Sequence, residues 1–433
     1  MELQVTIGFP YPDVKPLLLD GSHDVRVFEL PEYSAGVVGS AAVAKALREP
    51  IGTPRLAELA RGKRSALVVV DDVSRPTPAH TFVSLVLEEL KEGGIAEEGI
   101  AFIAALGTHR AMTTEEMVAK LGSQIVERHR VHDHDWADPS CLEYLGDTDQ
   151  GAPVWINKIV RQNDLVVGIG AIIPIDICGF TGGGKILVPG LSGEATVNHM
   201  HWTRVDLHSD QVIGKADNPI RASIDALARK AGLDFIVNVI TDGQGQIVHA
   251  VAGDMVAAHR AGCRVAAEVY GVRFSQEYDV VIADSYPFDI EFWQANKALD
   301  TAGEFVRKGG AIVLVSPCTE GWSQTHAAEI LEFGYPPIAR VKQLVGEGRI
   351  RNSVVGVHMY QVARAGVEKG RLILVSSGVS RAEVERVGFL WAEDSQSAFE
   401  TALQVVGTDS PRIAVLRDAA RMLPLRVPED RGK

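Results

Sequence analysis

Five groups of residues have types and spacings that suit chemistry. The first is Val-Asp-Asp-Val-Ser-Arg-Pro-Thr-Pro over 70–78, directly after an apolar run. A guanidinium offers a forked pair of donors to a carboxylate, so Arg75 is a candidate for binding a substrate carboxylate, with Asp72 orienting it. The alternative is a helix entry in which Ser74 or Thr77 caps free backbone amides. The two interpretations are compatible.

The second group is Leu-Gly-Thr-His-Arg over 106–110, which also follows an apolar run. A solitary histidine in a loop is more often a surface residue than a functional one. The carboxyl ends of neighbouring parallel strands, however, meet at one edge of a sheet. We therefore expect His109 to lie within reach of the same ligand as Arg75.

The third group is Gly179-Phe-Thr-Gly-Gly-Gly-Lys185, which matches the phosphate-loop spacing of glycine, four residues, glycine and lysine. A nucleoside triphosphatase has Ser or Thr at the next position, where this chain has Ile186, and Pro189 interrupts a helix soon afterwards. The pattern therefore predicts a loop that offers backbone amides to a nucleotide-like phosphate without magnesium chemistry. The alternative is a plain glycine-rich turn.

The fourth group is a pair of histidines, His199 and His201, in Asn-His-Met-His-Trp. Residues two apart point to opposite sides of a helix and to the same side of a strand. If the segment is helical, at most one of the two is expected to bind a metal. The tract over 132–138 is also rich in histidine and aspartate, and a polar loop explains it as readily as metal binding.

The fifth group lies in the second half of the chain. Gln294 and Lys297, within Phe-Trp-Gln-Ala-Asn-Lys, are three residues apart and share one face if the segment is helical. A solvated helix face explains this spacing equally well. The residues alone leave both interpretations open.

The elements that must position these groups alternate between β-branched runs and helical patterns, which is typical of βαβ units and parallel sheets. Asn218 and Pro219 have the types expected at the cap and first position of one helix. We expect helices over 79–90, 219–231 and 254–270, and strands over 66–70, 100–106, 165–169, 235–240, 247–250, 280–283, 311–315, 371–375 and 413–416.

The chain is too long, at 433 residues, for one ordinary core. We predict an α/β protein of two α/β domains with mostly parallel sheets and a cleft between them. The expected N-terminal domain covers residues 1–273 and binds a cofactor, and the C-terminal domain covers 274–433 and contributes to substrate binding. A ligand is expected at the carboxyl ends of the strands.

Composition excludes several classes of protein. Asp and Glu outnumber Lys and Arg by 56 to 43, for a net charge of -13, so a nucleic-acid partner is not expected. The four cysteines lie far apart, which indicates neither a disulfide framework nor a zinc knuckle. No apolar run reaches the roughly 18 to 20 residues of a membrane span, and the start lacks the basic region of a signal peptide. We expect a soluble, cytoplasmic protein.

In this order, the five groups resemble the nickel-dependent lactate racemase family over nearly the whole chain. The most specific stretch covers 151–201, with Pro-Val-Trp-Ile-Asn-Lys, Gly-Phe-Thr-Gly-Gly-Gly-Lys and Val-Pro-Gly. The resemblance implies a nickel-pincer nucleotide (a pyridinium bis-thiocarboxylate mononucleotide) covalently attached to Lys185. It implies His201 as the nickel ligand, with His199 as second choice. The other residues that it implies at the cofactor are Thr181, Gly182, Gly183, Gly184 and Asp72.

The resemblance also implies a racemase or epimerase of a 2-hydroxy acid, and we expect this substrate to be larger than lactate. Arg75, Gln294 and Lys297 would hold the substrate carboxylate and hydroxyl, Asp72 would support them, and His109 would be an acid/base. The cofactor takes the Cα hydride and returns it through a 2-oxo acid intermediate. Proteins that make the cofactor are the implied partners.

Two positions depart from the family pattern. The family has a second acid/base histidine where this chain has Ile175, which leaves Asp176, His199 or a group of the substrate to replace it. The aromatic residue that the family places in the second domain is also not found at its expected position near 357–361, where His358 and Tyr360 are the nearest candidates. Alternative functions are therefore hydride transfer without inversion, a non-catalytic protein that binds a nucleotide cofactor and, least favoured, a phosphate-loop triphosphatase.

Overall fold

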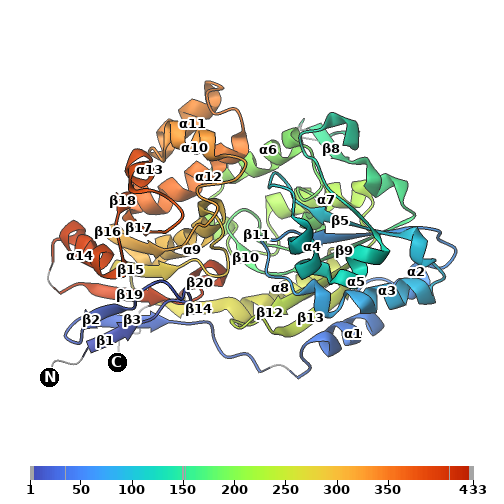
Figure 1. The fold of residues 1–433 in the computed structure, drawn as a ribbon, viewed down its shortest axis with the longest axis horizontal. Coiled ribbons are helices and arrows are strands. Elements are labelled where there is room, and N and C mark those ends of the chain that lie inside the picture. The colour runs from blue at the N-terminus through green and yellow to red at the C-terminus, as the bar shows by residue number, and fades with distance from the viewer. Residues whose placement is uncertain (1–3, 35, 149–150, 152, 409, 429–433) are drawn as a thin grey trace. The chain divides into compact units, whose positions relative to one another are not determined.

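The protein forms two compact α/β units, each built on its own twisted sheet (Figure 1). The computed structural model describes residues 4–34, 36–148, 151, 153–408 and 410–428. One unit comprises Glu32–Val269, and the other combines Met1–Pro31 with Tyr270–Lys433. The predicted fold class, α/β with mostly parallel sheets, is confirmed.

The sheet of the Glu32–Val269 unit has the strand order β13-β12-β9-β4-β5-β6, and all neighbours are parallel except β12 and β13. The central strands β4 and β9 are buried along their whole length, as expected for apolar runs covered on both faces. The strands are β4 (Ala66–Asp71), β5 (Ile100–Ala105), β6 (Arg130–His132), β9 (Leu165–Ala171), β12 (Phe235–Thr241) and β13 (Ile247–Gly253). The helices are α1 (Ser40–Arg48), α2 (Leu56–Leu59), α3 (Val83–Glu92), α4 (Thr114–Leu121), α5 (Ser123–Arg128), α6 (Glu194–Trp202), α7 (Pro219–Ala231) and α8 (Ala257–Tyr270).

Strands β9, β4 and β5 are consecutive neighbours in this sheet and run in the same direction. Their carboxyl ends therefore lie side by side. The loops that follow them contain most of three of the five groups singled out above: residues 72–78 after β4, 106–110 after β5 and 172–185 after β9. The topology alone brings these groups to one edge.

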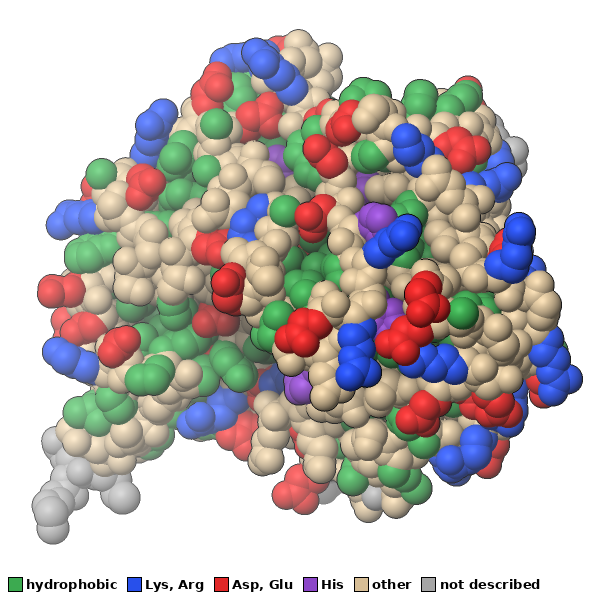
Figure 2. Space-filling model, turned by 45° about the vertical axis from the view of Figure 1, so that its right-hand side comes forward, with side chains coloured by type: hydrophobic (Ala, Val, Ile, Leu, Met, Phe, Trp, Pro, Cys, Tyr) green, Lys and Arg blue, Asp and Glu red, His purple; other side chains and the backbone are tan. Residues whose placement is uncertain are grey.

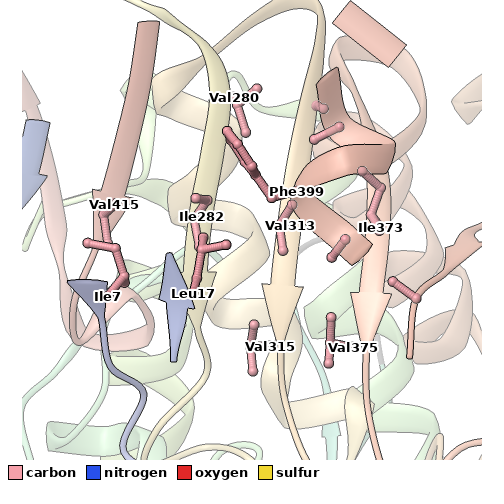
Figure 3. Close-up of a cluster of buried hydrophobic side chains, with 14 of the residues drawn as sticks. Ile7, Leu17, Val280, Ile282, Val313, Val315, Ile373, Val375, Phe399 and Val415 are labelled. Carbon is pink, nitrogen blue, oxygen red and sulfur yellow. The ribbon is translucent and has the colours of Figure 1, made fainter. Parts of the chain in front are cut away.

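The sheet of the second unit has the order β18-β17-β16-β15-β19-β3, with all neighbours parallel. Figure 3 shows part of its core, where Val280, Ile282, Val313 and Ile373 point from the strands toward Phe399 of α14. The strands are β3 (Asp24–Phe28), β15 (Tyr278–Asp284), β16 (Val306–Val315), β17 (Gly370–Val375), β18 (Leu390–Trp391) and β19 (Arg412–Leu416). The helices are α9 (Phe292–Phe305), α10 (Ala327–Phe333), α11 (Ile338–Gly346), α12 (Ser353–Ala363), α13 (Arg381–Arg386) and α14 (Ser395–Val406).

The expected N-terminal domain of residues 1–273 needs a correction at its start. Strand β3 pairs in parallel with β19, so the first 31 residues belong to the unit that contains the C-terminal half. Phe28 is buried there, with ring centroids 4.9 Å from Phe305 and 5.7 Å from Tyr278. A five-residue strand with mixed polarity is too short for hydrophobic periodicity to reveal. The other junction between the units lies at Tyr270.

Local signals predicted the long elements well. The helix over 219–231 has the predicted bounds, and Asn218 caps it by accepting a hydrogen bond of 2.9 Å from the amide of Arg221. The helix expected over 79–90 is instead split at Phe82 into a short 3₁₀ turn and α3. The helix expected from residue 254 begins at Ala257.

The surface carries both signs of charge. On the face shown in Figure 2, Lys and Arg side chains are interspersed with Asp and Glu side chains, so this face offers no continuous basic field. Within the described part of the chain, no helix is both long enough and apolar enough to cross a bilayer.

Candidate active site

An aspartate and a histidine form a short hydrogen bond at the carboxyl edge of the first sheet. Asp72 follows β4, and His109 lies in the loop after β5. Asp72 Oδ2 is 2.5 Å from His109 Nδ1, and Asp72 Oδ1 accepts a hydrogen bond of 2.5 Å from the Ser74 hydroxyl. Because an ionised carboxylate only accepts, His109 Nδ1 holds the proton and Nε2 of the neutral ring is its acceptor nitrogen. This orientation suits a general base.

The surrounding charges keep Asp72 ionised. Burial by itself raises the pKa of this carboxyl, but the imidazole of His109 and the guanidinium of Arg75 bring the pKa well below its ordinary value. Arg75 Nη1 donates to the carbonyl and hydroxyl oxygens of Ser74 at 3.1 and 2.8 Å. The structure thus brings Asp72, Arg75 and His109 together.

The helix-capping interpretation of Ser74 and Thr77 is wrong. Helix α3 starts after Phe82, and this N-cap residue makes no side-chain cap. The Ser74 hydroxyl binds Asp72 instead, and the Thr77 hydroxyl donates to Asp71 Oδ2 at 2.5 Å. The buried carboxylates of Asp71 and Asp72 need hydrogen-bond donors from the protein, and the two hydroxyls supply them. Exposed amides at a helix start can bind water instead.

The glycines of the 179–185 loop are required by packing. A Cβ added to Gly183 would lie 2.8 Å from the ring of His259, and one added to Gly184 would lie 2.8 Å from the Cβ of Ala228. Real Cβ atoms do not approach that closely, so only glycine fits. The phosphate-loop spacing therefore has a structural explanation here that does not involve a ligand.

Polar contacts fix the same loop to its unit. The amide of Gly183 donates to Asn238 Oδ1 at 2.8 Å, and the Thr181 hydroxyl donates to the last carbonyl of β9 at 2.6 Å. Arg221, which is fully buried, donates to the carbonyl of Gly182 at 3.0 Å. These contacts support the segment that ends at Lys185. The cofactor contacts predicted for Thr181 and the three glycines stay predictions.

Lys185 follows the glycines on a 3₁₀ turn, Gly183–Ile186, and is partly buried. Burial lowers its pKa to about 8, and the charges of Arg75 and Arg221 act in the same direction. A larger fraction of this amine is therefore unprotonated at neutral pH than in an exposed lysine. An unprotonated amine is the form that makes covalent bonds.

His201 lies near the end of α6, so the two-apart histidines are on a helix, where they point to different sides. His201 Nδ1 donates a hydrogen bond of 2.8 Å to the carbonyl of Val197. Burial, followed by the charge of Lys185, lowers the His201 pKa to about 4. The ring is therefore neutral at pH 7, with the Nε2 lone pair available to a metal.

A backbone hydrogen bond joins the loop of His109 to the segment that follows Lys185, since the amide of Gly107 donates to the carbonyl of Gly190 at 2.8 Å. Among the described residues, no group of three or more His, Cys, Asp and Glu side chains could hold a metal ion by itself. A metal at His201 would need its other donors from a bound group.

The histidine-rich tract over 132–138 has a structural role at its buried member. His134 Nε2 is 3.1 Å from the carbonyl of Ser192, and Nδ1 is 3.2 Å from Asn157 Nδ2. Burial lowers the His134 pKa to about 4. The polar-loop interpretation therefore fits better than metal binding.

Asp176, a candidate for the second acid/base, is held in a buried ion pair. Its Oδ1 lies 2.7 Å from Arg204 Nη2, and the two side chains are 1% and 0% exposed. Arg204 Nε also donates to the Asp176 carbonyl at 2.9 Å. The preceding Ile175 is only partly buried. We conclude that Asp176 is structural.

In the second unit, Gln294 and Lys297 lie on α9, which follows the carboxyl end of β15. Gln294 is only 1% exposed, so the solvated-face interpretation is wrong for it. Lys297 Nζ donates to Gln294 Oε1 and lies 4.5 Å from the ring centroid of Phe288. A lysine held in this way presents a fixed cation.

Sequence reasoning missed Trp293, which directly precedes Gln294. Its ring stacks on His358 at a centroid distance of 4.3 Å and an angle of 21°. His358 is buried, with Nδ1 2.9 Å from Asn296 Nδ2 and Nε2 2.9 Å from the Tyr335 hydroxyl. Burial lowers the His358 pKa to about 3. His358 therefore packs against the ring of Trp293 and does not take the place of the family's aromatic residue.

Both halves of the chain match family models. The model of the lactate racemase N-terminal domain matches residues 13–213, and that of the lactate racemase C-terminal domain matches residues 274–423. A lactate racemase from Thermoanaerobacterium thermosaccharolyticum is 30% identical over 385 residues, 88% of this chain and 89% of that protein. A lactate racemase from Lactiplantibacillus plantarum is 32% identical over 283 residues, 64% of this chain and 66% of that protein.

Solved structures share the fold. The lactate racemase apoprotein from Thermoanaerobacterium thermosaccharolyticum aligns with a TM-score of 0.83 at 25% identity, covering 98% of this chain and all of that one. A protein from Thermotoga maritima aligns with a TM-score of 0.75 at 21% identity over 91% of this chain. Two six-stranded α/β units and a strand-end Asp–His pair thus define a two-domain protein of the lactate racemase fold. The chain belongs to the lactate racemase family.

Proposed function

We propose that this protein is a racemase or epimerase of a 2-hydroxy acid that works with a nickel-pincer nucleotide on Lys185. The observation that carries the proposal is the Asp72–His109 hydrogen bond, in a loop whose Gly107 amide is hydrogen-bonded to the segment that follows Lys185. The relatives named lactate racemase support the reaction class. We expect a substrate larger than lactate, because the chain departs from the family pattern at Ile175 and near His358.

The residues present fit such a cofactor. Lys185 has a lowered pKa, which suits a covalent bond from its amine, and His201 offers a neutral imidazole nitrogen. His201 would supply one imidazole donor and the bound group would supply soft sulfur and carbon donors, a set that favours nickel over zinc. When bound, the group supplies an acceptor and donor for the Cα hydride of the substrate.

The chain's own side chains bind the substrate and move its proton. Arg75 presents its guanidinium to the substrate carboxylate, and Gln294 and Lys297 bind the carboxylate and hydroxyl. Nε2 of His109 accepts the proton of the 2-hydroxyl, and the Asp72 carboxylate stabilises the imidazolium that forms. Loss of the Cα hydride to the cofactor would leave a planar 2-oxo acid, and inversion would require this acid to turn its other face before the hydride is returned.

A second candidate function is hydride transfer without inversion, and the isoleucine at position 175 favours it. Inversion by two acid/base groups needs one to serve the 2-hydroxyl of each enantiomer, and Ile175 cannot move a proton. Asp176 is committed to Arg204. In an inverting enzyme, the remaining candidates for the second proton transfer are His199 and a polar group of the substrate.

Single enantiomers in deuterated water separate these functions. The loaded enzyme is incubated with one enantiomer of a 2-hydroxy acid, and the products are resolved by chiral chromatography and mass spectrometry. Inversion with the original hydrogen kept at Cα is the expected result, because hydride does not exchange with solvent. Persistent retention with formation of 2-oxo acid supports the second function, and deuterium at Cα rules out hydride transfer.

A non-catalytic, cofactor-carrying protein is the alternative from another class. Intact mass spectrometry and nickel analysis of protein from a host that makes the pincer test cofactor attachment separately from activity. A loaded protein that turns over no 2-hydroxy acid, or a His109→Ala variant that keeps full activity, favours the carrier. The proposal also includes the cofactor-making proteins as partners and a cytoplasmic location.

A further inference from the structure

Helix α4 lies against the loop that carries Asp72 and Arg75. Lys120, in its last turn, is only 7% exposed. Its Nζ donates to Asp71 Oδ1 at 3.0 Å, to the Arg75 carbonyl at 2.7 Å and to the Thr77 carbonyl at 3.4 Å. One ammonium group has three donors, and all three are used on the same short loop.

The first turn of α4 is hydrogen-bonded to the loop that contains His109. Thr113 and Glu116 form a capping box at the helix start. The Glu116 carboxylate also accepts two hydrogen bonds of 2.7 Å from the guanidinium of Arg110, the residue after His109. Such a bidentate pair fixes direction as well as distance. A single helix therefore fixes both strand-end loops.

The adjacent carboxylates of Asp71 and Asp72 bind different partners. Consecutive residues at the end of a strand point to opposite sides, so Asp71 faces Lys120 and Thr77 while Asp72 faces His109. Burial raises the pKa of Asp71, and the charge of Lys120 opposes that rise. Without Lys120, Asp71 would be a buried carboxylate that had lost its ion pair of 3.0 Å.

We propose that Lys120 is a positioning residue, which sets the Asp72–His109 distance and the direction of Arg75 by holding the 71–77 loop on α4. The geometric part of this proposal is independent of the reaction. Only its kinetic test rests on the proposed racemase function.

The test compares Lys120→Met, which keeps the apolar stem but removes charge and donors, with Lys120→Arg, which keeps both. Lys91→Met is the matched control, because Lys91 is 43% exposed and makes one ion pair of 3.0 Å with Glu97. The readout is the Nδ1 proton of His109 in ¹H–¹⁵N spectra of the cofactor-free protein. A His109→Gln variant assigns the signal.

We expect the His109 Nδ1 proton signal in wild type, Lys120→Arg and Lys91→Met. In Lys120→Met we expect it to disappear through exchange with water at temperatures where the protein stays folded by circular dichroism. Should Lys120→Met fail to fold, Asp71→Asn removes the same ion pair with little change of shape and decides the question. A folded Lys120→Met or Asp71→Asn with the wild-type signal and exchange rate overturns the proposal.

Kinetics provide the second readout. With the cofactor loaded, Lys120→Met should raise KM for the hydroxy acid by roughly 10-fold and lower kcat by about 100-fold, as expected when binding and proton-transfer groups are displaced together. Lys120→Arg should recover most of both. A wild type without racemase activity contradicts the proposed function and leaves the NMR result to decide the role of Lys120.

Discussion

His201 Nδ1 donates its hydrogen bond to the carbonyl of Val197, one turn earlier in α6. This bond fixes the ring and leaves Nε2 as the nitrogen that can bind a metal. We expect His201→Ala, purified from a host that makes the pincer cofactor, to retain at least ~10-fold less nickel than wild type. Nickel content by plasma mass spectrometry measures this.

His199→Ala is the matched control for that experiment, because His199 lies two residues away on the same helix and points elsewhere. Its nickel content should equal that of wild type. The assignment of the ligand would be reversed if His199→Ala lost nickel and His201→Ala kept it.

Lys185 should lower the stability of the cofactor-free protein. Its pKa of about 8 in the fold lies below the ordinary 10.5, so the unfolded chain holds the proton more tightly between these two pH values. The cost to stability is therefore full below pH 8 and vanishes above 10.5. We expect Lys185→Met to raise the free energy of unfolding by ~1 kcal/mol at pH 7. Urea unfolding should show this gain shrinking by pH 10, and a gain independent of pH would contradict the assignment.

The buried pair of Asp176 and Arg204 should contribute mainly to stability. Asp176→Ala leaves Arg204 as an uncompensated buried charge and should cost ~3–5 kcal/mol in urea unfolding. Glu385→Ala, which breaks an exposed pair with Arg381, is the control and should cost less than ~1 kcal/mol. Asp176→Asn keeps the shape of the side chain. If this variant folds but loses inversion, Asp176 moves a proton after all.

Ile175→His tests the missing proton-transfer group. Because Ile175 is only partly buried, an imidazole at this position has access to a bound ligand. We expect inversion to accelerate by at least ~10-fold, which is less than the roughly 10²- to 10⁴-fold that a well-positioned acid or base contributes. Chiral chromatography measures the rate, and Ile175→Leu should leave it unchanged. An equal rate in Ile175→His would place the second proton transfer elsewhere.

Nine strands of the two sheets could be predicted because each contains an apolar, β-branched run bounded by polar residues, whereas β3, β6 and β18 are too short to show one. Arg75 and His109 could be placed near one another because they follow strands whose carboxyl ends share an edge. The glycine loop shows where this reasoning stops. Glycines that admit a phosphate and glycines that admit the ring of His259 have the same spacing.

Contacts between side chains that are distant in the sequence could not be predicted, because they depend on how separate elements pack. In the sequence, Lys120 is indistinguishable from any other lysine of an amphipathic helix. Its hydrogen-bond partners lie more than forty residues earlier. Trp293 is in a segment singled out only for Gln294 and Lys297, and its stacking on His358 depends on how α9 and α12 pack. Neither pairing has a local signal.

Strand β3 determines how the chain can fold during synthesis. Its partner β19 is made nearly four hundred residues later. The Glu32–Val269 unit has all of its own strands and can form while the ribosome is still working. Strand β3 can pair only after β19 has been translated. A gene truncated before residue 270 would therefore encode β3 without its partner strand.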